Sequence, residues 1–241
     1  MRVFVVAGSP AAQQPQGLTP GLEDLVIAAD LGAQHALRWG WQVHLLVGDL
    51  DSLPADTVRG LEAAGVEVVR VRAAKDETDT ELAVARSLEM GAEQLVICGA
   101  TGGRTDHLLA NVFLLARASL SGVDACLVDG GETIRLLRAD GDSARLNARA
   151  QGRKDTTQLP DAGAGLGRLT IEGAAGDLLS LLPLGADAAG VSTGGLLYPL
   201  VDETLHLGEA RGISNVLTGS RAQVSLRRGR LLVIHNRMAH K

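Results

Sequence analysis

The stretch of residues 43–51, VHLLVGDLD, ends a short apolar run in a glycine and two acidic residues. A helix-like stretch follows at residues 55–64, and the same alternation recurs from residue 3 to residue 128. Such alternation is typical of an α/β domain, because parallel strands need helical crossovers that cover both faces of the sheet. The sequence therefore predicts a Rossmann-like, mainly parallel sheet with strands at residues 3–7, 25–29, 43–47, 66–71, 95–98 and 123–128, and helices at residues 32–39, 55–64, 79–90 and 106–120.

The second part of the chain has a different rhythm. Helical periodicity largely disappears after Asp129, and short runs rich in Val and Leu are separated by Gly, Pro, Asp and Ser. This pattern predicts an all-β domain with strands at residues 168–171, 178–182, 196–201, 204–207, 222–226 and 231–235, the last two joined through Arg228-Gly229 as a hairpin. We therefore predict domains at residues 1–130 and 131–241, with a flexible, polar, Gly-rich insertion near residues 139–167.

Composition excludes several classes of protein. The 241 residues carry a net charge of -5, and only 2% of them are aromatic. Phosphate backbones attract positive surfaces and single-stranded bases stack on rings, so we expect no nucleic-acid partner. No apolar run is long enough to cross a bilayer, so we expect no membrane partner. Cys98 and Cys126 lie in separate apolar runs, which favours reduced core thiols over a disulfide and fits a cytoplasmic protein.

Acidic and glycine residues follow the predicted parallel strands. Asp30 follows the second run, and Gly48-Asp49 follows the third. Ligands of open parallel sheets bind at the carboxyl ends of the strands, so these residues are expected on one rim. Asp49 and Asp51 are two positions apart and can face the same space, as carboxylates that hold Mg²⁺ do. An ordinary acidic turn before the next helix is the alternative interpretation of this motif.

Two further motifs belong to the same rim. Residues 75–81, KDETDTE, place Asp79 in the first turn of a predicted helix, which a capping box of Thr78 and Glu81 would also explain. In residues 99–107, GATGGRTDH, glycines would let backbone N–H groups approach phosphate oxygens, and Arg104 would add a planar charged fork. The loop lacks the Gly-Lys-Ser/Thr of a P-loop. Of the six histidines only His107, beside Asp106, is a candidate for the site. Together the motifs predict a metal and polyphosphate site.

The order of GDLDS (residues 48–52), KDETDTE and GATGGRTDHLLAN (residues 99–111) resembles the catalytic domain of the thiamine pyrophosphokinase family. LLSLLPLG (residues 178–185), GVSTGGLLYPL (residues 190–200) and GISN (residues 212–215) are similar to that family's thiamine-binding domain. The resemblance implies an α/β catalytic domain, a small β-sandwich domain, and a homodimer whose active site lies between subunits. The chain departs from the family at residues 29–34, which are Ala-Asp-Leu-Gly-Ala-Gln where the family has Ala-Asp-Gly-Gly-Ala-Asn, so one glycine and the asparagine are replaced.

The resemblance also implies roles for individual residues. Asp49, Asp51 and Asp79 match the family's metal and catalytic carboxylates, with Asp30 a further member near the nucleotide. The nucleotide site would comprise Asp30, Gly102, Gly103, Arg104, Asp106 and His107, and the thiamine site Tyr198, Ser214 and Asn215.

The implied reaction moves a pyrophosphoryl group from ATP to the hydroxyl of thiamine, with Mg²⁺ as cofactor and AMP as the second product. Whether Asp79 binds metal or acts as a general base is left open by the sequence. Two alternatives remain: a related pyrophosphatase or pyrophosphokinase with another acceptor, and a non-catalytic sensor of thiamine or nucleotide.

Overall fold

The computed structural model describes residues 1–139 and 167–238, and the chain divides into two compact units, Met1–Gly131 (unit 1) and Glu132–Lys241 (unit 2). Apart from its first and last residues, the insertion predicted at residues 139–167 lies outside the described residues. No helix in the described part of the chain is long and apolar enough to cross a membrane.

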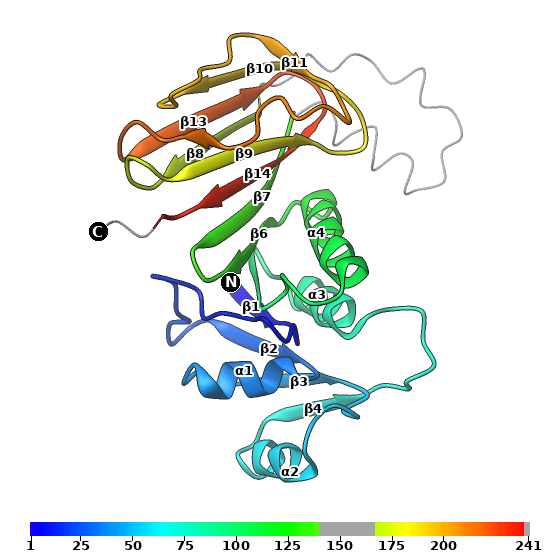
Figure 1. Ribbon diagram of the computed structural model, residues 1–241. Coiled ribbons are helices and arrows are strands. Elements are labelled where there is room, and N and C mark those ends of the chain that lie inside the picture. The colour runs from blue at the N-terminus through cyan, green and yellow to red at the C-terminus, as the bar shows by residue number, and fades with distance from the viewer. Residues whose placement is uncertain (140–166, 239–241) are drawn as a thin grey trace. The chain divides into compact units, whose positions relative to one another are not determined.

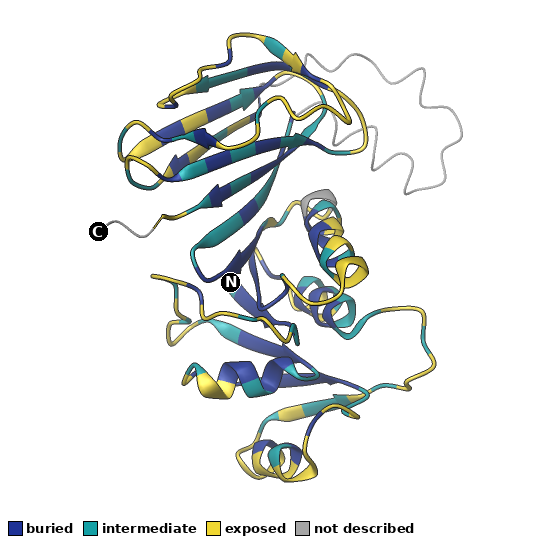
Figure 2. Ribbon diagram, in the orientation of Figure 1, coloured by how far each residue is buried: buried dark blue, intermediate teal, exposed yellow. Residues whose placement is uncertain are grey.

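Unit 1 contains a parallel sheet whose strands, except the edge strand β4, are buried along most of their length (Figures 1 and 2). Its strand order is β6-β5-β1-β2-β3-β4, and each neighbouring pair runs parallel. The bounds are β1 Arg2–Val6, β2 Leu25–Ala29, β3 Leu45–Gly48, β4 Glu67–Arg70, β5 Gln94–Cys98 and β6 Asp124–Asp129. The helices between them are α1 Gly32–Arg38, α2 Ala55–Ala63, α3 Asp79–Glu89 and α4 Thr105–Leu120.

The apolar strands predicted from the sequence are explained by helices on both faces of this sheet. Phe4, Ala28 and Leu46 share a core cluster with residues of α1 and α2. The side chains of Val5 and Ile27 alternate to the opposite face and are fully buried, and α3 contacts both of their strands. Burial on two sides removes the polar positions that a strand with one exposed face would carry.

Unit 2 is a sandwich of two antiparallel sheets. One has the order β12-β9-β14-β7 and the other β11-β10-β13-β8. Leu181 and Leu231 from the first sheet share one core cluster with Val191 and Val224 from the second. The bounds are β7 Glu132–Arg138, β8 Gly167–Glu172, β9 Leu178–Pro183, β10 Ala188–Gly194, β11 Glu203–Leu205, β12 Asn215–Val216, β13 Arg221–Leu226 and β14 Arg230–Asn236.

The end of β7 and the start of β8 lie in close backbone contact. A Cβ atom built on Gly167 would lie 2.1 Å from the carbonyl oxygen of Arg138. Only glycine fits at this point, because the approach leaves no space for a side chain.

Three details of the predicted topology need correction. Parallel pairing is confined to β1–β6, and the strands of unit 2 pair antiparallel, so a mainly parallel sheet is not confirmed for the described strands as a whole. The hairpin expected through Arg228-Gly229 is wrong, because β13 and β14 belong to different sheets. The strand expected at residues 196–201 is also wrong: that stretch is a loop that contains an isolated bridge between Leu196 and Leu217, and the strand before it is β10.

Both cysteines are buried thiols, as the sequence predicts. They lie in the neighbouring strands β5 and β6, and burial raises the pKa of the Cys98 thiol well above its usual range. A buried thiol with a raised pKa is mostly protonated at neutral pH and therefore unreactive.

Candidate functional site: a carboxylate rim in unit 1

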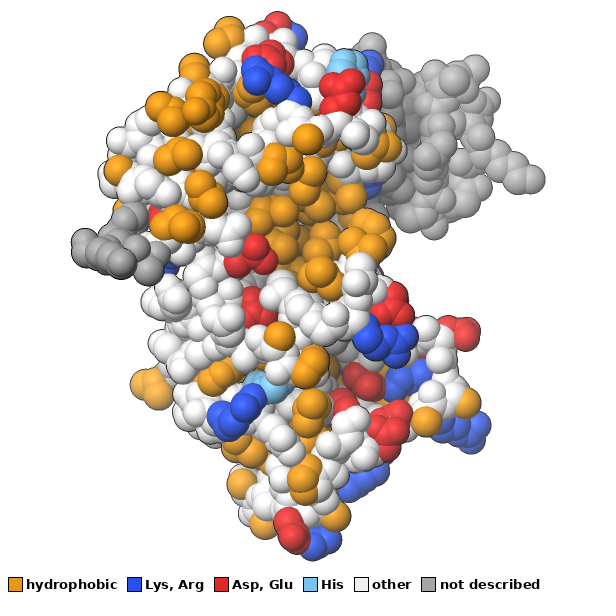
Figure 3. Space-filling view, in the orientation of Figure 1, with side chains coloured by type: hydrophobic (Ala, Val, Ile, Leu, Met, Phe, Trp, Pro, Cys, Tyr) orange, Lys and Arg blue, Asp and Glu red, His pale blue; other side chains and the backbone are white. Residues whose placement is uncertain are grey.

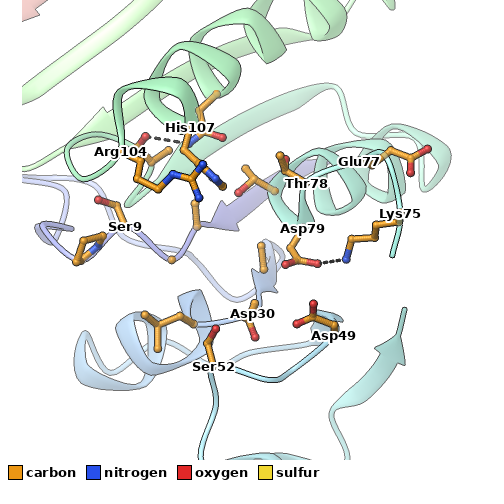
Figure 4. A pocket seen from close by; sticks show the side chains of 18 of the residues that line it. Ser9, Asp30, Asp49, Ser52, Lys75, Glu77, Thr78, Asp79, Arg104 and His107 are labelled. Atoms are coloured by element: carbon orange, nitrogen blue, oxygen red, sulfur yellow. Dashed lines mark hydrogen bonds and ion pairs between the residues drawn. The ribbon is translucent and has the colours of Figure 1, made fainter. Parts of the chain in front are cut away.

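A cavity of about 610 Å³ lies at the carboxyl ends of the parallel strands (Figure 4). The segments after β1, β2, β3 and β5 line it, together with the segment before α3. The sequence prediction that strand ends meet on one rim is therefore correct in its geometry. The polar and charged side chains of the lining are Ser9, Asp30, Asp49, Ser52, Lys75, Asp76, Glu77, Thr78, Asp79, Thr80, Arg104, His107 and Asn111.

Three carboxylates come together in this cavity. Asp30, Asp49 and Asp79 each offer an oxygen, and these oxygens all lie within 4.8 Å of one another. The side chains point toward the same space from the ends of β2 and β3 and the first turn of α3 (Figure 4). Gly48 permits the close packing, because a Cβ atom there would lie 3.1 Å from the Cβ of Asp30.

Asp30 is held in an unfavourable state. Its Oδ1 atom is buried with no hydrogen-bond partner, and its φ of 45° lies in the left-handed region. Burial raises the pKa of Asp30; Ser52 and the Leu31 backbone oppose this shift by hydrogen bonding, while the charges of Asp79 and Asp49 add to it. A carboxylate that is partly desolvated beside two like charges is suited to a bound cation.

Asp51 does not join these carboxylates. It is exposed and lies outside the cavity lining, so the expectation that Asp49 and Asp51 face the same space is not met here. The reason is Leu50, whose φ of 63° turns the chain between them. The backbone N–H of Asp51 donates to Oδ1 of Asp49 at 3.3 Å, and the hydroxyl of Ser52 donates to Oδ1 of Asp51 at 2.9 Å. Asp51 thus contacts the cavity through Ser52.

The start of α3 positions Asp79. Thr78 is the N-cap residue, and its hydroxyl accepts the backbone N–H of Glu81 at 3.1 Å. The predicted capping box is only half formed, because the Glu81 carboxylate instead accepts a hydrogen bond from Arg117 of α4 at 2.8 Å. With Thr78 satisfying the helix end, Asp79 is free to face the cavity, where it forms an ion pair with Lys75.

The glycine-rich segment after β5 contributes an arginine to the rim. Gly102 and Gly103 have φ values of 75° and 68°, which only glycine adopts readily. Arg104 then donates to both carboxylate oxygens of Asp106, at 3.1 and 2.6 Å, and this pairing lowers the pKa of Asp106. Gly102, Arg104 and His107 line the cavity, whereas Gly103 and Asp106 do not. Asp106 therefore orients Arg104 from outside.

The residues predicted to bind thiamine lie in unit 2. Tyr198 is 62% exposed and therefore does not lie in the core of the sandwich. Asn215 is buried, and its amide both accepts the Tyr198 N–H at 3.0 Å and donates to the Tyr198 carbonyl at 2.6 Å. Ser214 has a φ of 54°, and its N–H donates to the Ser180 hydroxyl at 3.0 Å. Asn215 therefore fixes the backbone of Tyr198, whereas Ser214 is tied to Ser180 of β9.

Sequence reasoning missed several residues of the cavity. Ser9 lines the cavity and follows β1, so the rule about strand ends applies to it as well. Asn111 is buried in α4, and its amide donates to the carbonyl of Ala100 at 2.9 Å. Asn111 therefore fixes the glycine-rich segment, and it lies one helical turn beyond His107, a spacing that could have identified it.

Comparison with known proteins identifies the family. Residues 22–127 match the family model described as "Thiamin pyrophosphokinase, catalytic domain", and residues 168–231 match "Thiamin pyrophosphokinase, vitamin B1 binding domain". The chain belongs to the thiamin pyrophosphokinase family. The first match contains Asp30, Asp49, Asp79 and Arg104, and the second contains Tyr198.

Individual members of this enzyme family match over nearly the whole chain. The thiamine pyrophosphokinase of Bacillus subtilis is 28% identical over 236 residues, which cover 97% of this chain and 98% of the relative. The crystal structure of thiamine pyrophosphokinase from Bacillus subtilis has a TM-score of 0.80 at 26% identity, covering 99% of this chain and 100% of that one. The structure of thiamin pyrophosphokinase from Geobacillus thermodenitrificans has a TM-score of 0.76 at 25% identity, with 99% of both chains covered.

Proposed function

We propose that this member of the family transfers the pyrophosphoryl group of ATP to the hydroxyl of thiamine, giving thiamine diphosphate and AMP. The hydroxyl oxygen of thiamine attacks the β-phosphorus, the bond from that phosphorus to the oxygen bridging it to the α-phosphorus breaks, and the hydroxyl proton is released. This chemistry asks the protein mainly for positioning and for neutralisation of charge. The observation that carries the proposal is the cluster of Asp30, Asp49 and Asp79 facing one cavity with Arg104.

The carboxylate cluster fits a divalent cation. The buried Oδ1 of Asp30 has no partner among the described groups, and hard oxygen donors are what Mg²⁺ prefers. We propose that Asp30, Asp49 and Asp79 hold Mg²⁺, and that Asp51 contributes from the outer side through Ser52 or a water molecule. The bound ion would supply neutralisation of polyphosphate charge.

The chain's own cationic and amide groups would hold the nucleotide. Arg104 is kept in place by its two hydrogen bonds to Asp106, so its remaining guanidinium donors can contact phosphate oxygens. The open backbone of the Gly102-Gly103 segment lets N–H groups approach the same oxygens, and His107 lines the cavity one turn further on. We assign nucleotide and metal binding to residues 1–130.

We assign thiamine binding to residues 131–241, with Tyr198 as the contact side chain. The exposed tyrosine ring can stack on the cationic thiazolium of thiamine. Asn215 would act by holding the backbone of Tyr198, and Ser214 by holding the start of β12 against Ser180 of β9. We also propose a cytoplasmic homodimer; the exposed apolar side chains of Leu197 and Val201 beside Tyr198 support a further contact surface there.

One assay tests the proposed reaction. The purified full-length protein is incubated with ATP, Mg²⁺ and thiamine, and the nucleotide and thiamine products are separated by chromatography. We expect AMP and thiamine diphosphate in equal amounts. Release of ADP, or phosphate release that does not depend on thiamine, would contradict the proposal and favour a different acceptor. Tight thiamine binding without turnover would favour a sensor.

A further inference from the structure

The side chain of Lys75 lines the cavity, and the proposed reaction gives it no role. It precedes α3, and its ammonium forms an ion pair with Oδ1 of Asp79. The two side chains are only 15% and 25% exposed. In Figure 4 the Lys75 side chain reaches Asp79 on the side where Asp49 also lies. A cation thus occupies the carboxylate cluster in the ligand-free protein.

Stabilisation of the helix does not explain a lysine at this position. Lys75 lies three residues before the N-cap Thr78, near the positive end of the helix dipole, where a cation is unfavourable. The local fold alone would favour a neutral or acidic residue, so the cavity itself must account for the charge.

The charges of the cavity suggest what Lys75 does. With all three carboxylates ionised, Asp30, Asp49, Asp79 and Lys75 leave two net negative charges, which one divalent cation neutralises. A metal on Asp79 would compete with the ammonium, because both cations bind the carboxylate of that residue. The lysine side chain is long and flexible and carries three donors, so it can turn to a phosphate oxygen in the same cavity.

We propose that Lys75 is an exchangeable cation of the site: it neutralises the carboxylate cluster before substrate arrives and binds the polyphosphate once metal has taken its place on Asp79. The inference rests on the proposed function, which supplies the polyphosphate. Lys75 should therefore have two opposite effects: it weakens binding of the metal alone and strengthens binding of the metal together with the nucleotide.

The test measures these two effects separately in the full-length protein. Binding of Mn²⁺ alone is followed by electron paramagnetic resonance, and the KM for ATP is measured at saturating Mg²⁺. For Lys75→Gln we expect Mn²⁺ to bind several-fold more tightly and the KM for ATP to rise about tenfold, as for loss of one charge-assisted hydrogen bond. Lys75→Arg should recover most of the affinity for ATP.

Arg72→Gln is the matched control. It removes one positive charge from the same segment at an exposed position outside the cavity lining, so both measurements should stay at the wild-type values. Unchanged or weaker Mn²⁺ binding by Lys75→Gln would overturn the proposal, as would an unchanged KM for ATP; a lower Tm alone would show that Lys75 only fixes the start of α3. The Mn²⁺ measurement needs no turnover, so it tests the cation exchange even if the proposed reaction fails.

Discussion

The carboxylate rim of unit 1 and the segment around Tyr198 in unit 2 present opposite kinds of surface. At the rim, Asp30 has a buried oxygen with no partner and lies beside two further carboxylates. Around Tyr198 the polar groups of Asn215 are used within the fold, and the exposed side chains are the apolar Leu197, Tyr198 and Val201. In the space-filling view, charged side chains gather over part of unit 1, and hydrophobic ones are frequent on the surface of unit 2 (Figure 3).

This difference separates two kinds of contribution to function. The rim has unfavourable electrostatics that Lys75 relieves only in part, so changes there should alter both chemistry and stability. The Tyr198 segment has its polar groups satisfied and offers surface for contact, so changes there should alter affinity alone. The following predictions test that separation.

The largest effect is expected from Asp49→Asn. A neutral amide is a poor ligand for Mg²⁺, and turnover should fall on the order of 100-fold or more while the fold is retained. Asp51→Asn should also lower turnover, but with a smaller loss of Mn²⁺ affinity, because Asp51 lies outside the cavity. Steady-state kinetics and Mn²⁺ titration check both variants. Equal losses of metal affinity would mean that the turn at Leu50 rearranges when metal binds.

Arg104→Lys should give a loss of about tenfold or more in kcat/KM for ATP. Lysine keeps the charge, but it cannot make the paired hydrogen bonds to Asp106 that orient the guanidinium. Asp106→Asn is the companion variant, because it leaves Arg104 in place with a weaker partner and should show a smaller defect of the same kind. Full affinity for ATP in Arg104→Lys would show that Arg104 is a surface residue.

Tyr198→Ala should raise the KM for thiamine several-fold with little change in the KM for ATP, and Tyr198→Trp should be tolerated. The expected energy of the ring contact is about 0.5–2 kcal/mol. Kinetics for both substrates and the Tm of each variant are the measurements. Because Tyr198 is exposed, the Tm of the Tyr198→Ala variant should equal that of the wild type. A lower Tm with normal thiamine binding would support a structural role for Tyr198 instead.

The smallest effect concerns the stability of the ligand-free protein. The raised pKa of Asp30 means that its ionised form disfavours folding, a cost that is absent below the ordinary pKa of about 3.9 and fully present above the raised value. Asp30→Asn removes that cost and keeps a residue that tolerates positive φ. The variant should therefore gain stability over the wild type as pH rises through this window. Tm measured against pH with a metal chelator present would show it, and identical curves would contradict it.

The fold of unit 1 was predictable because strands buried on both faces and helices of ordinary length leave clear patterns. The convergence of Asp30, Asp49 and Asp79 followed from one topological rule about strand ends. The position of Asp51 could not be predicted, since it depends on the left-handed φ of Leu50, a residue type that rarely adopts it. In unit 2 β10 was not predicted, because its small residues lack the apolar pattern of a strand. The apolar run at residues 196–201 predicted a strand where the structure has a loop.

The structure also explains one departure from the family motif. A Cβ atom on Gly32 would lie 1.9 Å from the carbonyl oxygen of Val6, so no other residue fits there. The neighbouring position carries Leu31, which packs against the core cluster of unit 1. The chain has therefore kept Gly32, which close packing requires, and has Leu31 at the position where close packing does not require the family's glycine.

The contact between Arg138 and Gly167 has a consequence for how this chain can change in length. The polypeptide leaves β7 and enters β8 at almost the same point, so the fold of unit 2 sets no particular number of residues between them. Each doubling of such a connection costs only about 0.6 kcal/mol of closure entropy. In evolutionary and engineering terms this junction is a site of permitted insertion, where a reporter domain with adjacent termini could be placed without redesigning either sheet.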